Sequence, residues 1–190
     1  MNIFHLDKIL KLCAHYHCDK HVVKMILEYA QMLSTAHRML DCINTIKEES
    51  KNNMMVKRFV LHDKNLDFLL YKASHINHPC NIWVRESAGN YNYLYELFVY
   101  LNEEFTYRYG SIHSTFTKLN DYLKFLPKNI LLDNQTNYFT IPLCMPDEYK
   151  EKSYIESYRN FYIYGKSQKF NLTWKNRNVP EWYFEIDSNG

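Results

Sequence analysis

The sequence predicts a mainly α fold: a single compact helical domain over residues 1–190, with residues 166–190 as an irregular, aromatic-rich and basic C-terminal extension. Three observations support this prediction. The chain has 190 residues, an ordinary length for one domain, and 46% of them are hydrophobic, which is enough for a core. Only 4 Gly and 5 Pro punctuate it, which favours long helices over many tight turns. Apolar residues recur at helical spacing over residues 19–40.

Helix-start and helix-stop signals place the individual elements. Asp7 can cap a short helix over residues 8–16, and Asp19 can cap a longer one that runs to about residue 40. Four further helices are expected over residues 65–74, 90–110 with Gly110 as the C-cap, 114–126 and 147–166. The remaining segments are expected as a mobile loop over residues 44–53, a short strand over residues 56–61 and an irregular stretch over residues 129–146.

Composition limits the classes of protein. No window of about 18 apolar residues is present, so we expect no membrane span. The N-terminus lacks the basic start and apolar block of a secretory signal. Five scattered cysteines are an odd number and fit a reducing, intracellular setting, in the host cytoplasm or nucleus if the protein is viral. A net charge of +2 neither requires nor excludes nucleic acid.

Two groups of cysteine and histidine residues carry ligands that suit Zn²⁺. The first shares a helical face at a spacing of four residues: Cys13, His17 and His21. The second lies in one short segment: His75, His78 and Cys80. If the two groups converge, a zinc site would use Cys13, His17, His75 and His78. The spacing matches no standard zinc finger or ribbon, and the alternative is a set of hydrogen-bonding structural histidines.

The helix expected over residues 19–40 has one polar strip in an otherwise apolar surface. The strip spans roughly 100° and contains His21, Lys24, Glu28, Gln31, Thr35 and Arg38. In a cleft, desolvation would raise the pKa of Glu28 and the nearby cations would lower it, which suits general acid–base chemistry. The alternative is a solvated face with a Lys24–Glu28 pair one turn apart.

Two other segments are candidates for contacts with a ligand. Residues 74–78 form a polar loop ahead of Arg85, in which His75 and His78 could bind phosphate or a base edge, or else satisfy the backbone of a turn. Residues 159–177 hold five Lys or Arg, five aromatic residues and no acid. Alternating cations and rings suit nucleic acid, whereas the alternative is core aromatics beside an ordinary basic surface. The expected DNA face comprises Tyr164, Lys166, Trp174, Lys175 and Arg177.

Residues 19–31, DKHVVKMILEYAQ, resemble the catalytic helix of the phage and viral pyrimidine-dimer DNA glycosylases, small helical enzymes that excise UV-linked pyrimidines and cleave the strand. Asp19, His21 and Glu28 match the spacing of that family. Residues 74–110 resemble its loop and long helix, and residues 161–166, FYIYGK, resemble its aromatic C-terminal segment. The whole chain also resembles an uncharacterised group of phage and giant-virus proteins often assigned to this family.

The resemblance implies a DNA-repair glycosylase with AP lyase activity. The amine of the N-terminal residue, Met1 or Asn2, would attack C1′ of the damaged nucleotide and form a Schiff base, and β-elimination would break the strand. Glu28 would stabilise the sugar cation and move protons, and His21 would hold the sugar-phosphate. The partner would be double-stranded DNA, bent and with a flipped nucleotide, and no cofactor, membrane or obligate protein partner is expected. The implied DNA contacts are Lys24, Gln31, His75, His78, Arg85 and the C-terminal face.

The chain departs from the family pattern at three positions. Leu27 and Gln31 stand where the family flanks its glutamate with arginines, and Asn2 follows Met1 where the family exposes a threonine. Two other readings therefore stay open. One is a viral base- or nucleotide-modifying enzyme that uses Glu28 with the His75 and His78 loop. The other is a non-catalytic nucleic-acid-binding module that is stabilised by zinc bound to Cys13, His17, His75 and His78.

Overall fold

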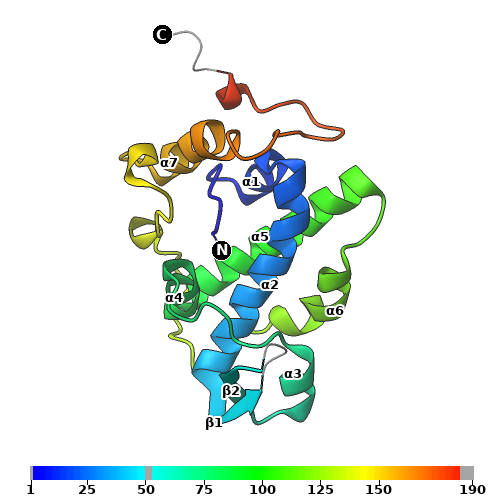
Figure 1. The fold of residues 1–190 in the computed structure, drawn as a ribbon, viewed down its shortest axis with the longest axis vertical. Coiled ribbons are helices and arrows are strands. Elements are labelled where there is room, and N and C mark those ends of the chain that lie inside the picture. The colour runs from blue at the N-terminus through cyan, green and yellow to red at the C-terminus, as the bar shows by residue number, and fades with distance from the viewer. Residues whose placement is uncertain (1, 50–52, 185–190) are drawn as a thin grey trace.

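The structure, a computed structural model, describes residues 2–49 and 53–184, and the protein is mainly helical, as the sequence predicts (Figure 1). Two long helices, α2 (Asp19–Asp41) and α5 (Ala88–Tyr109), pack against each other through the centre. The shorter α-helices lie around them: α1 (Leu10–Tyr16), α3 (Lys64–Leu69), α4 (Pro79–Glu86), α6 (Ser114–Leu123) and α7 (Tyr154–Asn160). The buried hydrophobic residues from Ile3 to Trp182 form one cluster.

The two central helices follow local signals that the sequence carries. Apolar side chains cover most of α2, including the fully buried Val22, Ile26 and Tyr29, so this helix is stabilised by packing rather than by propensity alone. Helix α5 begins after Ser87, whose hydroxyl accepts a hydrogen bond from Asn90 N. It ends at Gly110, which adopts a left-handed conformation with φ of 72° and donates to Thr106 O, so the expected C-cap is confirmed.

The N-terminal segment runs inside the molecule rather than over its surface. Residues 3–6 are all buried, and the segment passes beside α2 and α7 before α1 begins (Figure 1). The amide of Phe4 donates to the Tyr29 hydroxyl of α2 at 3.2 Å, and the Phe4 ring packs on Tyr158 of α7 at 5.9 Å. Residue 2, which is half-buried, therefore precedes a segment that is fixed in the interior of the fold.

The prediction of a mobile loop over residues 44–53 is wrong for its first part. Strand β1 (Cys42–Glu49) pairs antiparallel with β2 (Met55–Leu61), the strand that the sequence predicts, while residues 50–52 lie outside the described part of the chain. No residue of β1 is buried, so the strand has no apolar face to produce alternation in the sequence. Its pairing with β2 and cross-strand contacts such as Arg58–Glu48 hold it instead.

The single helix expected over residues 147–166 is three shorter elements. They are a 3₁₀ turn, η2 (Asp147–Tyr149), then α7, then a π-helical segment, η3 (Phe161–Lys166). Two more 3₁₀ turns, η1 (Tyr138–Thr140) and η4 (Glu181–Tyr183), lie in segments without regular helix. In the extension, Leu172, Trp174 and Trp182 are buried, so its described part packs against the helices. No helix among the described residues is long and apolar enough to cross a membrane.

Candidate functional site

Glu28 is the best-placed carboxylate on the polar strip of α2. Its side chain is 14% exposed and pairs with Lys24, 64% exposed and one turn earlier, at 3.0 Å between Nζ and Oε1. Val23 and Leu27 beside them are also exposed. The carboxylate is thus largely covered by protein but still reached by water. The environment of Glu28 is therefore intermediate between the two alternatives that the sequence allows, a carboxylate in a cleft and a carboxylate on a solvated face.

The rest of the predicted polar strip belongs to the interior. Arg38 is buried and donates to four backbone carbonyl groups while pairing with the Asp67 carboxylate at 2.7 Å. Thr35 is buried, and its hydroxyl bonds back to the Gln31 carbonyl. Gln31 itself is half-buried. Only the part of the polar strip around Lys24 and Glu28 is therefore accessible to a ligand.

Two basic residues from other elements lie close enough to Glu28 for its charge to affect their pKa. Burial lowers the pKa of His78, the N-cap of α4, and the Glu28 carboxylate acts in the opposite direction. Burial also lowers the pKa of Lys166 in η3, as do the charges of Lys169 and Lys24, and Glu28 again opposes the shift. The Glu28 carboxylate therefore lies near both the start of α4 and η3, next to Lys24.

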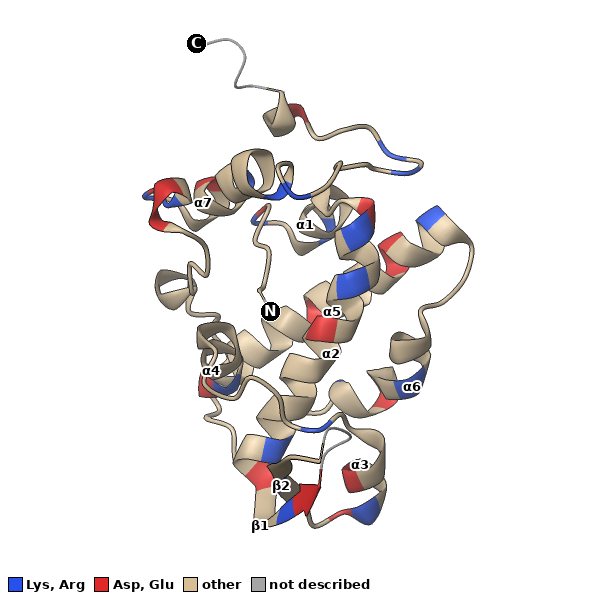
Figure 2. Ribbon diagram, in the orientation of Figure 1, with Lys and Arg blue, Asp and Glu red and all other residues tan. Residues whose placement is uncertain are grey.

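Four lysines form a cationic surface next to Glu28, which we call the α2 lysine patch: Lys20, Lys24, Lys166 and Lys169. Lys20 and Lys24 are one turn apart, and Figure 2 shows the corresponding blue bands on the first turns of α2. The Lys166 ammonium lies over the rings of Phe4 at 5.4 Å and Phe161 at 4.6 Å. These cation–π contacts hold Lys166 against the N-terminal segment.

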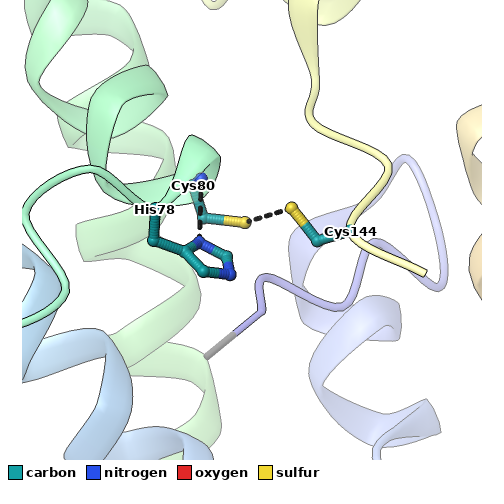
Figure 3. A group of neighbouring side chains, drawn as sticks. All are labelled: His78, Cys80 and Cys144. Carbon is teal, nitrogen blue, oxygen red and sulfur yellow. Dashed lines mark hydrogen bonds between the residues drawn. The ribbon is translucent and has the colours of Figure 1, made fainter.

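The N-terminal segment also reaches the residues around His78. The side-chain amide of Asn2 donates to the Cys144 carbonyl at 2.9 Å. Cys144 belongs to the irregular stretch before α7, and its Sγ lies 3.6 Å from Sγ of Cys80 in α4 (Figure 3). His78, Cys80 and Cys144 offer ligand atoms that all lie within 4.8 Å of one another. Asn2 thus contacts a residue next to His78, and Glu28 acts on His78 electrostatically, while Met1 lies outside the described residues.

The two thiols of this group are hydrogen-bonded to each other. A hydrogen bond from Cys80 lowers the pKa of Cys144, and the same interaction, with burial, raises the pKa of Cys80. The sequence singles out His78 and Cys80 but gives Cys144 no role, because it lies 64 residues further along in a segment without periodicity. A pair of cysteines brought together in this way is visible only in the fold.

The structure does not support the expected contact of His21 with a sugar-phosphate. Its ring is buried, hydrogen-bonded through Nδ1 to the Tyr162 hydroxyl, and stacked on Phe4 at 4.4 Å. Burial, with smaller contributions from His17 and Lys166, lowers the pKa of His21 to about 2. A neutral, covered imidazole offers no charge to a phosphate, so His21 is a core residue that positions the N-terminal segment.

The C-terminal DNA face expected from the sequence is not assembled. Trp174 is only 6% exposed, and its Nε1 donates to the Tyr16 carbonyl at 2.9 Å. Arg177 pairs with the buried Glu104 at 2.8 Å. Two residues of the expected DNA face, Tyr164 and Lys175, are exposed, but they lie in different segments. The Lys175 ammonium lies over the Tyr109 ring. The acidic partners of residues 159–177 come from other parts of the chain, since Asp7 pairs with Arg159 and Glu104 pairs with Arg177.

The remaining predicted contacts fall into two groups. Arg85 donates to the Ile76 carbonyl at 2.8 Å and so organises the loop, and His75 is exposed with a positive φ of 48°. The zinc set of Cys13, His17, His75 and His78 does not converge: the only group with ligand geometry in the described residues is the one around Cys144. Cys13 instead donates to Phe4 O, and His17 bonds to the Tyr29 hydroxyl.

The candidate site is therefore built from four separate segments. Glu28 comes from α2, His78 from the start of α4, Lys166 from η3 and Asn2 from the N-terminal segment. Each position is set by packing between segments, so no contiguous motif describes the site. No protein family model, curated protein or solved structure matches this chain.

Proposed function

We propose that the protein is a DNA glycosylase with associated AP lyase activity that acts on damaged, UV-dimerised pyrimidines. One observation carries the proposal: Asn2 is bonded to Cys144, a neighbour of His78, and the part-buried Glu28 acts electrostatically on the same histidine. The N-terminal end of the chain and a carboxylate thus come near one residue, and a backbone amine and a carboxylate are the two groups that this chemistry needs. Residue 1 lies outside the described residues, and the support comes from the position of residue 2.

The α2 lysine patch supports DNA as the partner. Lys20 and Lys169 are exposed, and Lys24 extends into solvent beside Glu28. Cations in such a group neutralise phosphates on both sides of a flipped nucleotide and position the duplex without reading its sequence. This surface takes the role that the sequence assigns to Trp174 and Arg177. Exposed Val23 and Leu27 lie beside it and can contact an unstacked base.

The proposed reaction proceeds through an imine. The unprotonated N-terminal amine attacks C1′ and the bond from C1′ to the base breaks, and the base takes up a proton while it stays joined to the other pyrimidine of the dimer. The sugar ring then opens to a Schiff base, a proton is lost from C2′, and the bond from C3′ to the phosphate oxygen breaks. An α-amine has a pKa of about 8, so a useful fraction is free near neutral pH. Glu28 stabilises positive charge on the sugar and transfers the protons.

Borohydride trapping on a UV-irradiated duplex tests the proposal. We expect the wild-type protein to form a covalent adduct, and Glu28→Gln to form it at least about 100-fold more slowly because the proton-transferring carboxylate is gone. Glu103→Gln is the matched control, since Glu103 is an exposed carboxylate on α5 away from the site. Acetylating the N-terminal amine is expected to abolish the adduct. No adduct with wild type, or an adduct mapped to a lysine side chain, would contradict the mechanism.

A further inference from the structure

His78 of the candidate site also belongs to a second group, with Cys80 and Cys144, to which the reaction proposed above assigns no chemical step. His78 and Cys80 come from the start of α4, and Cys144 comes from the irregular stretch over residues 129–146. Figure 3 shows the two sulfur atoms directed toward each other across the gap between these segments. Cys80 is fully buried, while His78 and Cys144 are half-buried, so the group lies just beneath the surface and an ion can reach it.

The spacing of the sulfur atoms fits a shared metal ion. Zinc–sulfur bonds of about 2.3 Å at tetrahedral angles place two thiolates roughly 3.8 Å apart, and the observed separation is 3.6 Å. A disulfide would require about 2.0 Å, and all five cysteines of the chain are free thiols. With every ligand atom within 4.8 Å of the others, the imidazole needs to move by only about 1 Å to complete a tetrahedral face.

The local backbone also favours thiolate ligands. Pro79 and Cys80 are the first two residues of the eight-residue helix α4, and the positive end of a helix dipole stabilises negative sulfur. The Cys80 amide now donates a weak hydrogen bond to Nδ1 of His78 at 3.2 Å. Coordination through either ring nitrogen would end this bond, because Nδ1 would then hold either the metal or a proton. The amide would become available to the thiolates.

We propose that His78, Cys80 and Cys144 bind one Zn²⁺ ion, with a water molecule in the fourth position. Two thiolates and one imidazole select zinc over magnesium or calcium, which prefer oxygen ligands. Binding displaces the thiol protons, which leave to solvent. The ion would fasten the irregular stretch to α4, and through the Cys144 carbonyl it would fix the position of Asn2. The site is proposed independently of the glycosylase reaction.

Metal analysis of untagged protein, purified without chelators, tests the proposal. We expect about one zinc per chain in the wild type and a loss of at least about tenfold in zinc affinity in Cys144→Ser and His78→Ala, since removal of a direct ligand costs more than the 10- to 100-fold of an outer contact. Cys42→Ser is the matched control, because Cys42 is a free, half-exposed cysteine outside the group. Protein with no zinc, or with equal zinc in Cys144→Ser, would overturn the proposal.

Two measurements on the wild-type chain avoid the risk that a variant misfolds. Co²⁺ added to the chelated protein is expected to give the charge-transfer and intense visible bands of tetrahedral thiolate coordination. Zn²⁺ is expected to protect Cys80 and Cys144, but not Cys42, from alkylation, as read by peptide mass. A Cys80–Cys144 disulfide in place of bound metal would refute the site. Because zinc content and imine trapping are read separately, failure of one proposal leaves the other distinguishable.

Discussion

At the scale of single residues, three histidines are buried in the core and carry no charge. His5 bonds to the Tyr93 hydroxyl at 2.8 Å, His17 to the Cys13 carbonyl at 2.7 Å, and His21 to the Tyr162 hydroxyl. Burial lowers the pKa of His5 to about 3, that of His17 to about 4 and that of His21 to about 2. All three belong to, or pack on, the N-terminal segment, so protonation would disrupt the part of the fold that positions Asn2.

These histidines predict a loss of stability in mild acid. In the unfolded chain their pKa is about 6.5, so below that pH the unfolded state binds more protons than the folded state. Their stabilisation is therefore complete above about pH 6.5 and declines as the pH falls toward the folded values, by up to about 1.4 kcal/mol per pH unit for each ring. The measurement is the free energy of unfolding in urea between about pH 7 and pH 5.

A single substitution isolates the contribution of His5 to this pH dependence. His5→Gln removes one proton-binding site, so we expect the slope of stability against pH to decrease, by up to about 1.4 kcal/mol per unit toward the acid end of the same window. His62→Gln, at an exposed position on the loop after β2, is expected to leave the slope unchanged. A slope that is the same in His5→Gln and wild type would show that the buried ring is not the cause.

At the scale of elements, the first turn of α5 is closed by the irregular stretch. Helix starts leave amides without partners, and here Ala88 N donates to Leu131 O at 2.9 Å and Gly89 N to Asp133 O at 2.7 Å. Gly89 has no side chain because a Cβ would lie 2.3 Å from the carbonyl carbon and oxygen of Gln135. This close approach anchors the stretch that carries Cys144.

Gly89→Ala therefore tests the anchoring of the irregular stretch. Alanine is the better helix former, but the added methyl would push the backbone at residue 135 away, so we expect a loss of about 1–3 kcal/mol in unfolding free energy. Glu96→Ala, at an exposed position of the same helix, is expected to change stability by less than about 0.5 kcal/mol. Urea unfolding measures both, and a stabilised Gly89→Ala protein would contradict the close packing.

At the scale of the whole molecule, a buried ionic cluster joins the C-terminal extension to the two central helices. Glu104 and Arg108 of α5 are both buried and bond at 2.7 Å, Arg108 reaches Asp19 of α2 at 2.9 Å, and Arg177 closes on Glu104. Burial alone would raise the pKa of Glu104, but hydrogen bonds from Arg177 and Arg108 outweigh it and lower that pKa. The extension is thus part of the fold rather than a free arm.

Trp174→Ala tests this role of the extension. If the ring is a core residue, its loss should lower the free energy of unfolding by about 3–5 kcal/mol. Tyr164→Ala, where the ring is exposed, should cost far less. Both are read from urea unfolding, together with binding of an undamaged duplex at low salt. Unchanged stability with weakened DNA binding in Trp174→Ala would restore the DNA face that the sequence suggests.

The sequence by itself determined the helical class and the elements with strong local signals. The central helices, the Gly110 cap and strand β2 follow from apolar periodicity, capping residues and glycine, which act over a few neighbouring residues. Strand β1 has no buried face and depends on its partner, so it carries no such signal. The same limit explains why residues 147–166 resemble one helix and fold as three elements.

Only the tertiary structure decided which side chains face a site. Glu104 pairs with the half-buried Arg177 across 73 residues of sequence, and Asn2 contacts Cys144 across 142. Lys24 and Glu28, adjacent on one helix face, keep the pairing that their spacing predicts. Burial and charge pairing depend on segments that chain packing brings together, whereas helix formation depends on neighbours along the chain. The candidate site depends almost entirely on contacts between such distant segments.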